Sequence, residues 1–349
     1  MPALQPRESV VSVDRPPPPT AGRGRKRAIV AAARAALGLA LLAFVVQRLD
    51  PARVLGSLSD PVWGALALAF AAQLAAKVVW TLRWQAVLRA NGLERGFLEL
   101  LALVLIGLFF NSFLPTSVGG DLVRGFHASR GREGLLASYA VLLVERALGA
   151  IALAALAAAA ATVAWALGSS PWPTELLAAV TVLGGSIVAA GAWAFAWSGW
   201  PRVLRRAERF HERLACQAAG LIRALELFRH PGTPRAWIVA NSLALQVIAV
   251  LFHVACARAV GLETPTVLFF LIVPASVLAS MIPVSLNGLG VREGVLVGLL
   301  LATGAPAERA GAFAVLALLV STVFALIGGL VNPFYATPAG EAKRAQPDA

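Results

Sequence analysis

Long apolar runs constrain this chain more than any other feature of its sequence. Several stretches near 20 residues contain almost no charge, and a helix of about 20 apolar residues is long enough to cross the hydrocarbon core of a bilayer. The chain is 58% hydrophobic and only 14% charged, whereas about a quarter of the residues of a soluble domain are charged. The sequence therefore predicts an all-α, polytopic transmembrane helix bundle and excludes an ordinary soluble globule.

The apolar runs predict six full membrane spans, which cover residues 28–46, 61–80, 135–167, 174–197, 236–260 and 310–331. The preceding residues 1–27 hold four consecutive prolines and a basic cluster without apolar periodicity, which is typical of a disordered arm. The last residues, 332–349, form a polar tail. Residues 28–331 are therefore expected to make a single transmembrane domain.

Positive charge sets the expected orientation of the spans. The net charge is +12, and it falls in loops between apolar runs, as topology selection in a membrane requires. This distribution argues against nucleic-acid binding. The longest basic loop, residues 198–235, holds eight arginines against three glutamates and predicts an amphipathic cytoplasmic segment. The same rule places residues 124–132 and both termini in the cytoplasm.

Two further segments are expected to enter the membrane without crossing it. Basic stretches at 83–95 and 124–132 enclose only residues 97–123, so a full crossing there would place one of them outside. A segment that enters from the cytoplasm, breaks at Pro115 and returns avoids this conflict. Counting the membrane crossings in the same way predicts a second re-entrant pair over 266–303, which enters from the outside. Full crossings that violate the positive-inside rule are the alternative.

The two predicted breaks share one residue pattern. Ser, Pro, Ser, Gly, Val and Arg recur with identical spacing in residues 112–124 and 280–292, at a constant offset of 168 residues. The prolines, Pro115 and Pro283, would end the incoming helices, and glycine permits backbone conformations closed to other residues. Broken backbone at membrane depth must be buried in protein or line a wet cavity. The pattern predicts an inverted repeat with a site near the midplane; a chance match of small residues is the alternative.

Charged and hydroxyl side chains gather at these breaks. A lone charge at the bilayer centre costs about 2.5–3.5 kcal/mol on insertion scales, so these groups must pair, face water or lie near an interface. Guanidinium forks, hydroxyls and free N–H groups at helix starts suit a phosphate. The expected ligands of a lipid phosphate are Arg124, Arg292, Ser117, Ser285, Gly120 and Gly288. The expected charge-pairing residues are Asp121, Glu145, Arg146 and Glu293, which compete with the lipid or serve structure alone.

Residues near the end of the predicted 61–80 span receive simpler interpretations. Lys77 and Arg83 lie where long cationic side chains can snorkel to the headgroups. Trp80 and Trp84 fit an aromatic belt at the membrane interface. No stacking site is therefore needed to explain the two tryptophans.

One helix face in residues 236–260 is polar. Ser242, Gln246 and His253 share this face, and such residues more often bond to neighbouring helices than to substrate. The sequence has no phosphate-binding loop, no metal-ligand spacing and no nucleophile elbow. Neither a metal nor a cofactor is therefore expected, and an enzyme is the less favoured class.

The break motifs resemble the hallmark of the lysylphosphatidylglycerol synthase transmembrane family, the flippase-like membrane proteins. The resemblance rests on residues 111–124 and 283–294, together with Glu145-Arg146 and Arg83-Trp84. It implies an inner-membrane protein related to the lipid-translocating half of aminoacyl-phosphatidylglycerol synthases. Because the chain stops after its last span, we expect the stand-alone form without an aminoacyl-transferase domain.

The favoured function is binding or translocation of an anionic lipid, or of a lipid-linked intermediate, across the inner membrane. One alternative is a non-catalytic partner that holds a glycosyltransferase or lipid-modifying enzyme at the membrane through residues 198–235. The other is a membrane-embedded headgroup transferase that uses Asp121 or Glu293 as a base.

Overall fold

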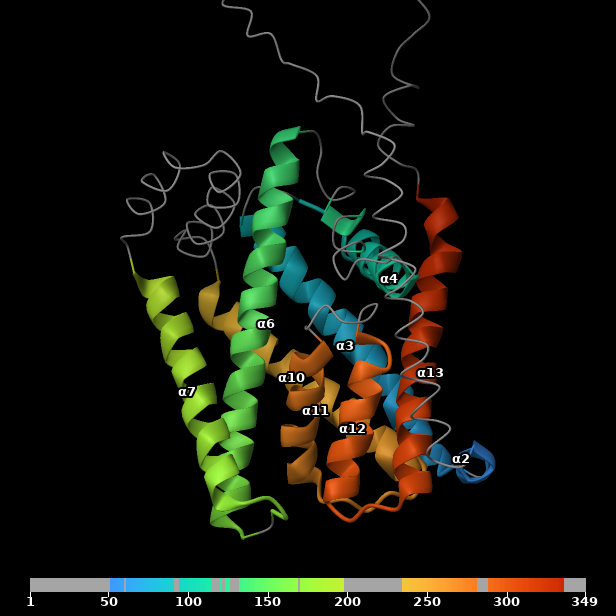
Figure 1. Ribbon diagram of the computed structural model, residues 1–349. Coiled ribbons are helices and arrows are strands. Elements are labelled where there is room, and N and C mark those ends of the chain that lie inside the picture. Colours follow the sequence, from blue (N-terminus) through green and yellow to red (C-terminus); the bar gives the residue numbers. More distant parts are fainter. Residues whose placement is uncertain are drawn as a thin grey trace, which may run out of the picture.

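The computed structural model is a bundle of helices, and the described part of the chain contains no strand (Figure 1). The structure describes residues 51–59, 61–90, 94–113, 120, 123–125, 132–168, 170–197, 234–280 and 288–335. The helices are α2 (Pro51–Leu58), α3 (Trp63–Ala90), α4 (Phe97–Phe113), α6 (Arg132–Ala166), α7 (Thr174–Ala196), α10 (Arg235–Ala259), α11 (Thr266–Ser280), α12 (Val291–Ala302), α13 (Ala307–Val331) and the short 3₁₀ helix η2 (Asn332–Phe334).

Five of these helices, α3, α6, α7, α10 and α13, are long and apolar enough to cross a membrane. Their apolar stretches are 23 to 28 residues long, which exceeds the roughly 20 residues that a bilayer core requires. They correspond to five of the six predicted spans. The remaining predicted span, 28–46, lies outside the described residues, as do the arm 1–27, residues 198–233 of the basic loop and the tail after residue 335.

Helix α3 extends ten residues beyond the predicted end of its span. The prediction stopped at Trp80, whereas α3 continues to Ala90. Arg83 therefore lies inside the helix and is only 4% exposed, so the prediction that it snorkels at a span end was wrong. The physical reason is that other helices provide Arg83 with polar partners, which a search for apolar runs along one segment cannot detect.

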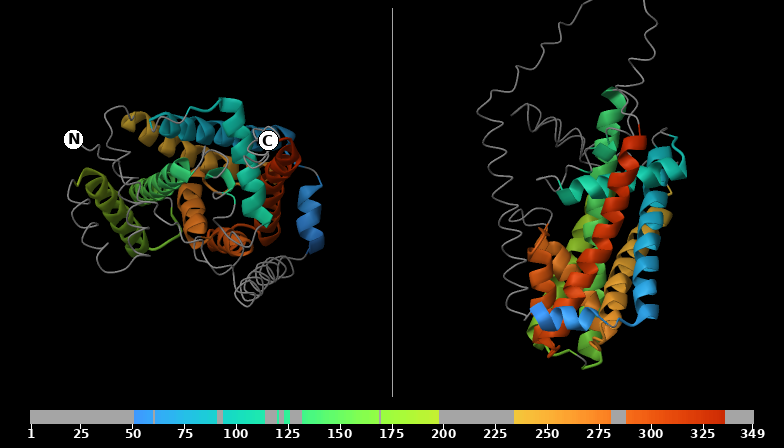
Figure 2. Two further views of the ribbon diagram at one scale, coloured as in Figure 1. Left: turned by 90° about the horizontal axis from the view of Figure 1, so that it is seen from above. Right: turned by 90° about the vertical axis from the view of Figure 1, so that its right-hand side faces the viewer.

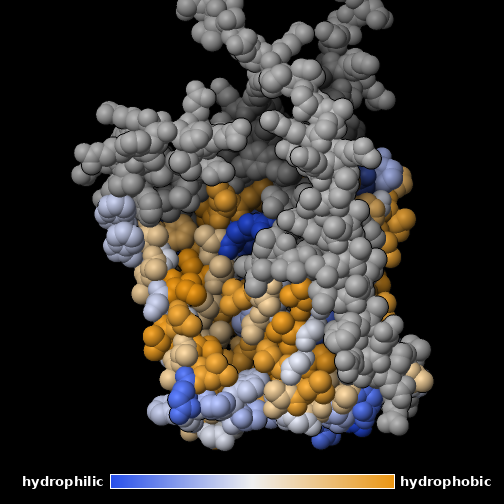
Figure 3. Space-filling view, viewed as in Figure 1, coloured by the Kyte–Doolittle hydropathy of each residue, from blue (hydrophilic) through white to orange (hydrophobic). Residues whose placement is uncertain are grey.

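The outside of the bundle is apolar over most of its height. Figure 3 shows a hydrophobic band above a lower edge of hydrophilic residues. Helix α7 lies at the periphery and packs chiefly on α6. Its outer side chains are large and exposed, among them Leu176, Val182, Leu183 and Ile187. A surface of this kind is matched to lipid rather than to water.

Three helices of the bundle interior, α4, α11 and α12, are shorter as described than a bilayer core is thick. Helices α4, α11 and α12 contain 17, 15 and 12 residues, which at 1.5 Å per residue gives about 26, 22 and 18 Å. The hydrocarbon core is about 30 Å thick. Helix α4 lies in the upper half of the bundle beside α13, whereas α11 and α12 occupy the lower half (Figure 1). Figure 2 shows α2 lying across the bundle at its lower end.

The 168-residue offset between the break motifs extends to the helices around them. Shifted by 168 residues, the bounds of α4 become 265–281, close to those of α11, and the bounds of α3 become 231–258, close to those of α10. Helix α4 packs on α13, and its counterpart α11 packs on α6. The bounds of α6 become 300–334 after the same shift and enclose those of α13. Each of the short helices α4 and α11 therefore packs on a long helix from the other half of the chain.

The helices α3 and α10 run in opposite directions. At the start of α3, the Val62 N–H donates to the carbonyl of Ala259, at the end of α10, over 2.9 Å. Near the other end of the pair, the Arg83 side chain reaches Ser242. Helices α6 and α13 also point in opposite directions (Figure 1). The pairs α3/α10 and α6/α13 are thus each antiparallel.

Gly328 permits α13 to approach α4 at backbone contact. A Cβ built at this glycine would lie 1.9 Å from the carbonyl oxygen of Leu105 in α4. Small residues allow this close approach, and it is a main source of helix association in lipid, where apolar burial alone gives little driving force. The α4–α13 contact consequently depends on the absence of a side chain at residue 328.

Gly328→Ala is expected to lower the thermal unfolding midpoint of the purified protein, because the two backbones must separate. Overpacking costs typically about 1–3 kcal/mol, and a clash with backbone favours the upper part of that range. Tryptophan fluorescence in detergent measures the midpoint. Gly298→Ala in α12 is the matched control, since a Cβ there meets no atom within 4 Å. Equal midpoints for the two variants would contradict the tight α4–α13 contact.

Candidate anion-binding site

Three charged side chains from separate parts of the chain meet inside the bundle. Arg83 of α3, Glu145 of α6 and Arg124, from the short helical segment 123–125, are 4%, 4% and 3% exposed. Arg124 Nη2 donates to Glu145 Oε2 over 2.8 Å, and Arg83 Nε lies 3.7 Å from Glu145 Oε1. Two guanidinium groups therefore share one buried carboxylate. We call these three residues the Arg83–Glu145–Arg124 cluster.

Two tryptophans of α3 support the guanidinium group of Arg124. Its Cζ atom lies 4.8 Å from the ring centroid of Trp80 and 4.5 Å from that of Trp84. The rings are four residues apart and so share one face of the helix. A desolvated cation–π contact is worth about 2 kcal/mol or more. The rings hold the cation in place without neutralising its charge.

The cluster has buried donors without acceptors. Arg83 Nε and the indole N–H groups of Trp80 and Trp84 have no hydrogen-bond partner among the residues that the structure describes. Arg83 Nη1 donates to Ser242 Oγ over 3.1 Å, and that hydroxyl donates to the Ile238 carbonyl. A buried donor left without an acceptor costs about 1–3 kcal/mol. Oxygen atoms of an anion are suitable acceptors for donors of this kind.

A second charged pair lies at the start of α12. Arg292 Nη2 and Nε donate to Glu293 Oε1 over 2.8 and 3.0 Å, and Glu293 Oε2 accepts the Gly290 N–H over 2.8 Å. The Glu293 side chain is 2% exposed and that of Arg292 is 30% exposed. Gly290 has a φ of +79°, which favours glycine. Glu293 thus fixes both the helix start and the neighbouring guanidinium group.

His253 of α10 is buried, and its Nδ1 lies 2.7 Å from the carbonyl oxygen of Ala249 in its own helix.

The predicted phosphate-binding glycines make close contacts within the protein. The Gly120 N–H donates to Asn111 Oδ1 over 2.8 Å, and a Cβ on Gly120 would lie 1.9 Å from the Gly107 carbonyl oxygen. Gly288 has a φ of +77°, and a Cβ there would lie 2.3 Å from Ser280 Cβ. Both glycines thus pack against the helix that precedes their break, and the Gly120 N–H already has an acceptor.

Of the remaining predicted site residues, the structure describes only Arg146. Arg146 follows Glu145 on α6 but is exposed. The others lie outside the described residues: Ser117, Ser285, Asp121, Pro115 and Pro283.

Sequence reasoning missed the contribution of α3 to the site. Trp80, Arg83 and Trp84 were assigned to a span end, although their spacing of three and four residues is that of one helix face. The polar face of α10 was interpreted correctly in part. Ser242 bonds to Arg83, and Gln246 Nε2 donates to the Gly149 carbonyl of α6 over 3.3 Å, so both residues connect neighbouring helices.

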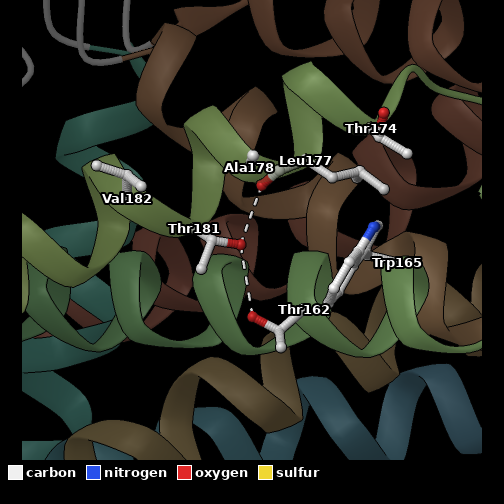
Figure 4. Close-up of a pocket in the computed structure, with 7 residues that line it drawn as sticks. All are labelled: Thr162, Trp165, Thr174, Leu177, Ala178, Thr181 and Val182. Carbon is white, nitrogen blue, oxygen red and sulfur yellow. Dashed lines mark hydrogen bonds between the residues drawn. The ribbon is translucent and has the colours of Figure 1, made fainter.

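A separate pocket of about 250 Å³ lies between the end of α6 and the start of α7 (Figure 4). Its lining includes Trp165, Leu177 and the facing hydroxyls of Thr162 and Thr181, which are 3.4 Å apart. Each of these hydroxyls also donates to a carbonyl of its own helix. No charged side chain lines this pocket, which distinguishes it from the cationic site.

The apolar helices and the buried charges define a multi-pass helical membrane protein. The chain belongs to the family of the lysylphosphatidylglycerol synthase TM region, whose family model matches residues 31–329. It is 28% identical to a UPF0104 membrane protein of Methanothermobacter thermautotrophicus over 292 residues, which is 77% of this chain and 83% of the relative. A UPF0104 membrane protein of Methanocaldococcus jannaschii is 33% identical over 85 residues, which is 23% of this chain and 25% of that relative.

Proposed function

We propose that the protein binds the phosphate of an anionic membrane lipid at the Arg83–Glu145–Arg124 cluster and carries the headgroup across the membrane. The observation that carries this proposal is the set of buried donors without acceptors, Arg83 Nε and the indoles of Trp80 and Trp84. Guanidinium groups match phosphate oxygens with two parallel hydrogen bonds. The family membership supports a membrane substrate without identifying it.

Glu145 would compete with the lipid phosphate for the same donors. The carboxylate holds Arg124 Nη2 at 2.8 Å, so the buried cations are partly neutralised. A phosphate that approaches Arg83 and the two indoles offers further acceptors and weakens the interaction between Glu145 and Arg124. Because one anion replaces another, the site need not expose an uncompensated cation at membrane depth.

The short helices suggest a route for the headgroup. We infer that α4 with the break after it enters from one side of the membrane and α11 with α12 from the other, as an inverted repeat with re-entrant pairs. Their lengths and their places in opposite halves of the bundle support this arrangement. Arg124 and Arg292 would then lie at equivalent places in the two repeats, and the lipid tails would stay in the bilayer while the headgroup crosses.

We also propose that the protein lies in the inner membrane with both termini in the cytoplasm. The end of α7 and the start of α10 flank the basic loop 198–235, and both lie at the upper end of the bundle (Figure 1). The positive-inside rule assigns this end to the cytoplasm. The end of α13, which leads to the tail, lies at the same end.

Arg83→Gln tests the proposed function in reconstituted vesicles. Purified protein is incorporated with fluorescent phosphatidylglycerol, and dithionite quenching of the outer leaflet gives the translocation rate. We expect the rate to fall about 10- to 100-fold, because a hydrogen bond to a charged group contributes about 1.5–3 kcal/mol. Arg83→Lys restores charge without the planar fork and should give an intermediate rate.

Arg89→Gln is the matched control for this experiment. Arg89 lies on the same helix, but its side chain is exposed, so the rate should equal that of the wild type. The unfolding midpoint of each variant shows whether the fold is retained. A folded Arg83→Gln protein with the wild-type rate would overturn the proposed function.

A further inference from the structure

The pocket between α6 and α7 opens at the apolar periphery of the bundle. Most of its lining side chains are exposed, whereas Leu177 at its floor is only 3% exposed. Leu177 packs with Ala161 and Ala164 of α6 in a buried cluster, so the pocket is closed behind it. Because α7 lies at the outside of the bundle (Figure 1), the molecules that can enter this pocket come from the membrane.

A close contact between the helices closes the pocket toward the membrane interior. Gly184 of α7 lies so near α6 that a Cβ there would be 2.6 Å from the carbonyl oxygen of Ala154. The lining residues lie between this contact and the helix ends, with Trp165 next to the end of α6 and Thr174 at the start of α7. Tryptophan is typical of the membrane interface. The pocket therefore runs from the interface into the adjoining part of the hydrocarbon core.

The facing hydroxyls of Thr162 and Thr181 have no proton left for the contact between them. Each hydroxyl donates its one proton to a carbonyl of its own helix over 2.9 Å. The two oxygen atoms are 3.4 Å apart, which exceeds the roughly 2.5–3.0 Å of a direct O–H···O hydrogen bond. A hydroxyl oxygen has two acceptor lone pairs. Both oxygens can therefore accept a proton from a ligand that enters the pocket (Figure 4).

The charge and the size of the pocket define the class of ligand. Among the described residues, no charged side chain lines it, and an unpaired ion at this depth is costly. Its volume of about 250 Å³ is below the roughly 300–1,000 Å³ of pockets that enclose a whole small molecule. The ligand is therefore uncharged, and only the part around its polar group enters while the rest stays in the bilayer.

We propose that this pocket binds an uncharged membrane lipid through a free hydroxyl group of that lipid. The lipid hydroxyl donates to Thr162 Oγ1 or Thr181 Oγ1, and the adjoining methylene groups pack on Leu177 and on the ring of Trp165, which extends from α6 toward α7 (Figure 4). This site is separate from the phosphate site of the proposed function, because Thr162 lies about 25 Å along α6 from Glu145.

Photolabelling of the full-length protein in phosphatidylcholine nanodiscs tests this inference. The probes carry a diazirine and are a diacylglycerol, a long-chain alcohol and the methyl ether of that alcohol, and mass spectrometry locates the label. Saturable labelling of residues 162–182 by the diacylglycerol alone identifies a glycerolipid as the ligand, and saturable labelling by the alcohol identifies any aliphatic hydroxyl. Saturable labelling by the ether as strong as that by the alcohol overturns the inference, as does the lack of saturable labelling with every probe.

The variant Thr162→Val/Thr181→Val tests the role of the hydroxyl pair. Valine keeps the branched shape without the hydroxyl, so the half-saturation concentration of the labelling probe should rise about 3- to 10-fold. Thr322→Val is the matched control, because Thr322 of α13 also donates to a carbonyl of its own helix but does not line the pocket. The unfolding midpoint shows that each variant is folded. A folded double variant with the wild-type half-saturation concentration overturns the inference.

Discussion

Glu145→Gln is expected to lower the free energy of unfolding by about 3–5 kcal/mol, because removing one partner of a buried ion pair leaves uncompensated charge. Glutamine keeps the size of the side chain but not its charge. Arg83 and Arg124 are 4% and 3% exposed, so water cannot replace the carboxylate. Reversible unfolding in uncharged mixed micelles, followed by tryptophan fluorescence, measures this loss.

An anionic lipid should partly restore the stability of Glu145→Gln. If lipid phosphate and carboxylate compete for the same donors, phosphatidylglycerol should raise the unfolding midpoint of the variant more than that of the wild type. Glu263→Gln is the control, because Glu263 is exposed in the turn after α10 and its loss should change neither value. An equal response of variant and wild type to the lipid would contradict the competition.

The double variant Arg124→Gln/Glu145→Gln is expected to recover stability but not transport. Removing both charges of a buried pair is often nearly neutral, whereas removing one is strongly destabilising. The double variant should therefore unfold at a higher midpoint than Glu145→Gln. Its translocation rate should fall about 10- to 100-fold, because the hydrogen bond of Arg124 to the charged ligand, which contributes about 1.5–3 kcal/mol, is lost.

The same two measurements decide between a structural and a functional Arg124–Glu145 pair. A pair that serves structure alone would leave the double variant stable and as active as the wild type. A site that binds lipid would leave it stable and inactive. Wild-type translocation by the double variant would therefore remove Arg124 from the proposed mechanism.

The helix pattern could largely be predicted from the sequence because lipid imposes a length on each apolar run. The predicted re-entrant segment 97–123 begins at the same residue as α4, and the predicted 174–197 span differs from α7 by one residue. The exception is α3, where the apolar run was ended at Trp80. A charged residue interrupts an apolar run in the sequence. The helix continues through that residue when neighbouring helices supply polar partners for its side chain, as they do for Arg83.

The candidate site could be predicted only where its residues lie near the break motifs. Arg124, Glu145, Arg292 and Glu293 were identified because charge in an apolar segment requires a partner. The role of α3 could not be predicted, because Arg83 meets Ser242 across 159 positions of sequence. Whether a cation faces lipid, a partner or a ligand depends on such long-range packing.

The peripheral helix α7 has a consequence for how the whole chain is threaded. Helix α6 ends at the lower end of the bundle, and α10 begins at the upper end (Figure 1), so one return passage is needed between them. Because α7 crosses the bundle once between α6 and α10, α10 starts at the upper end, whereas α3 starts at the lower end. A helix that adds little to the core thus sets the direction in which α10 enters the bundle.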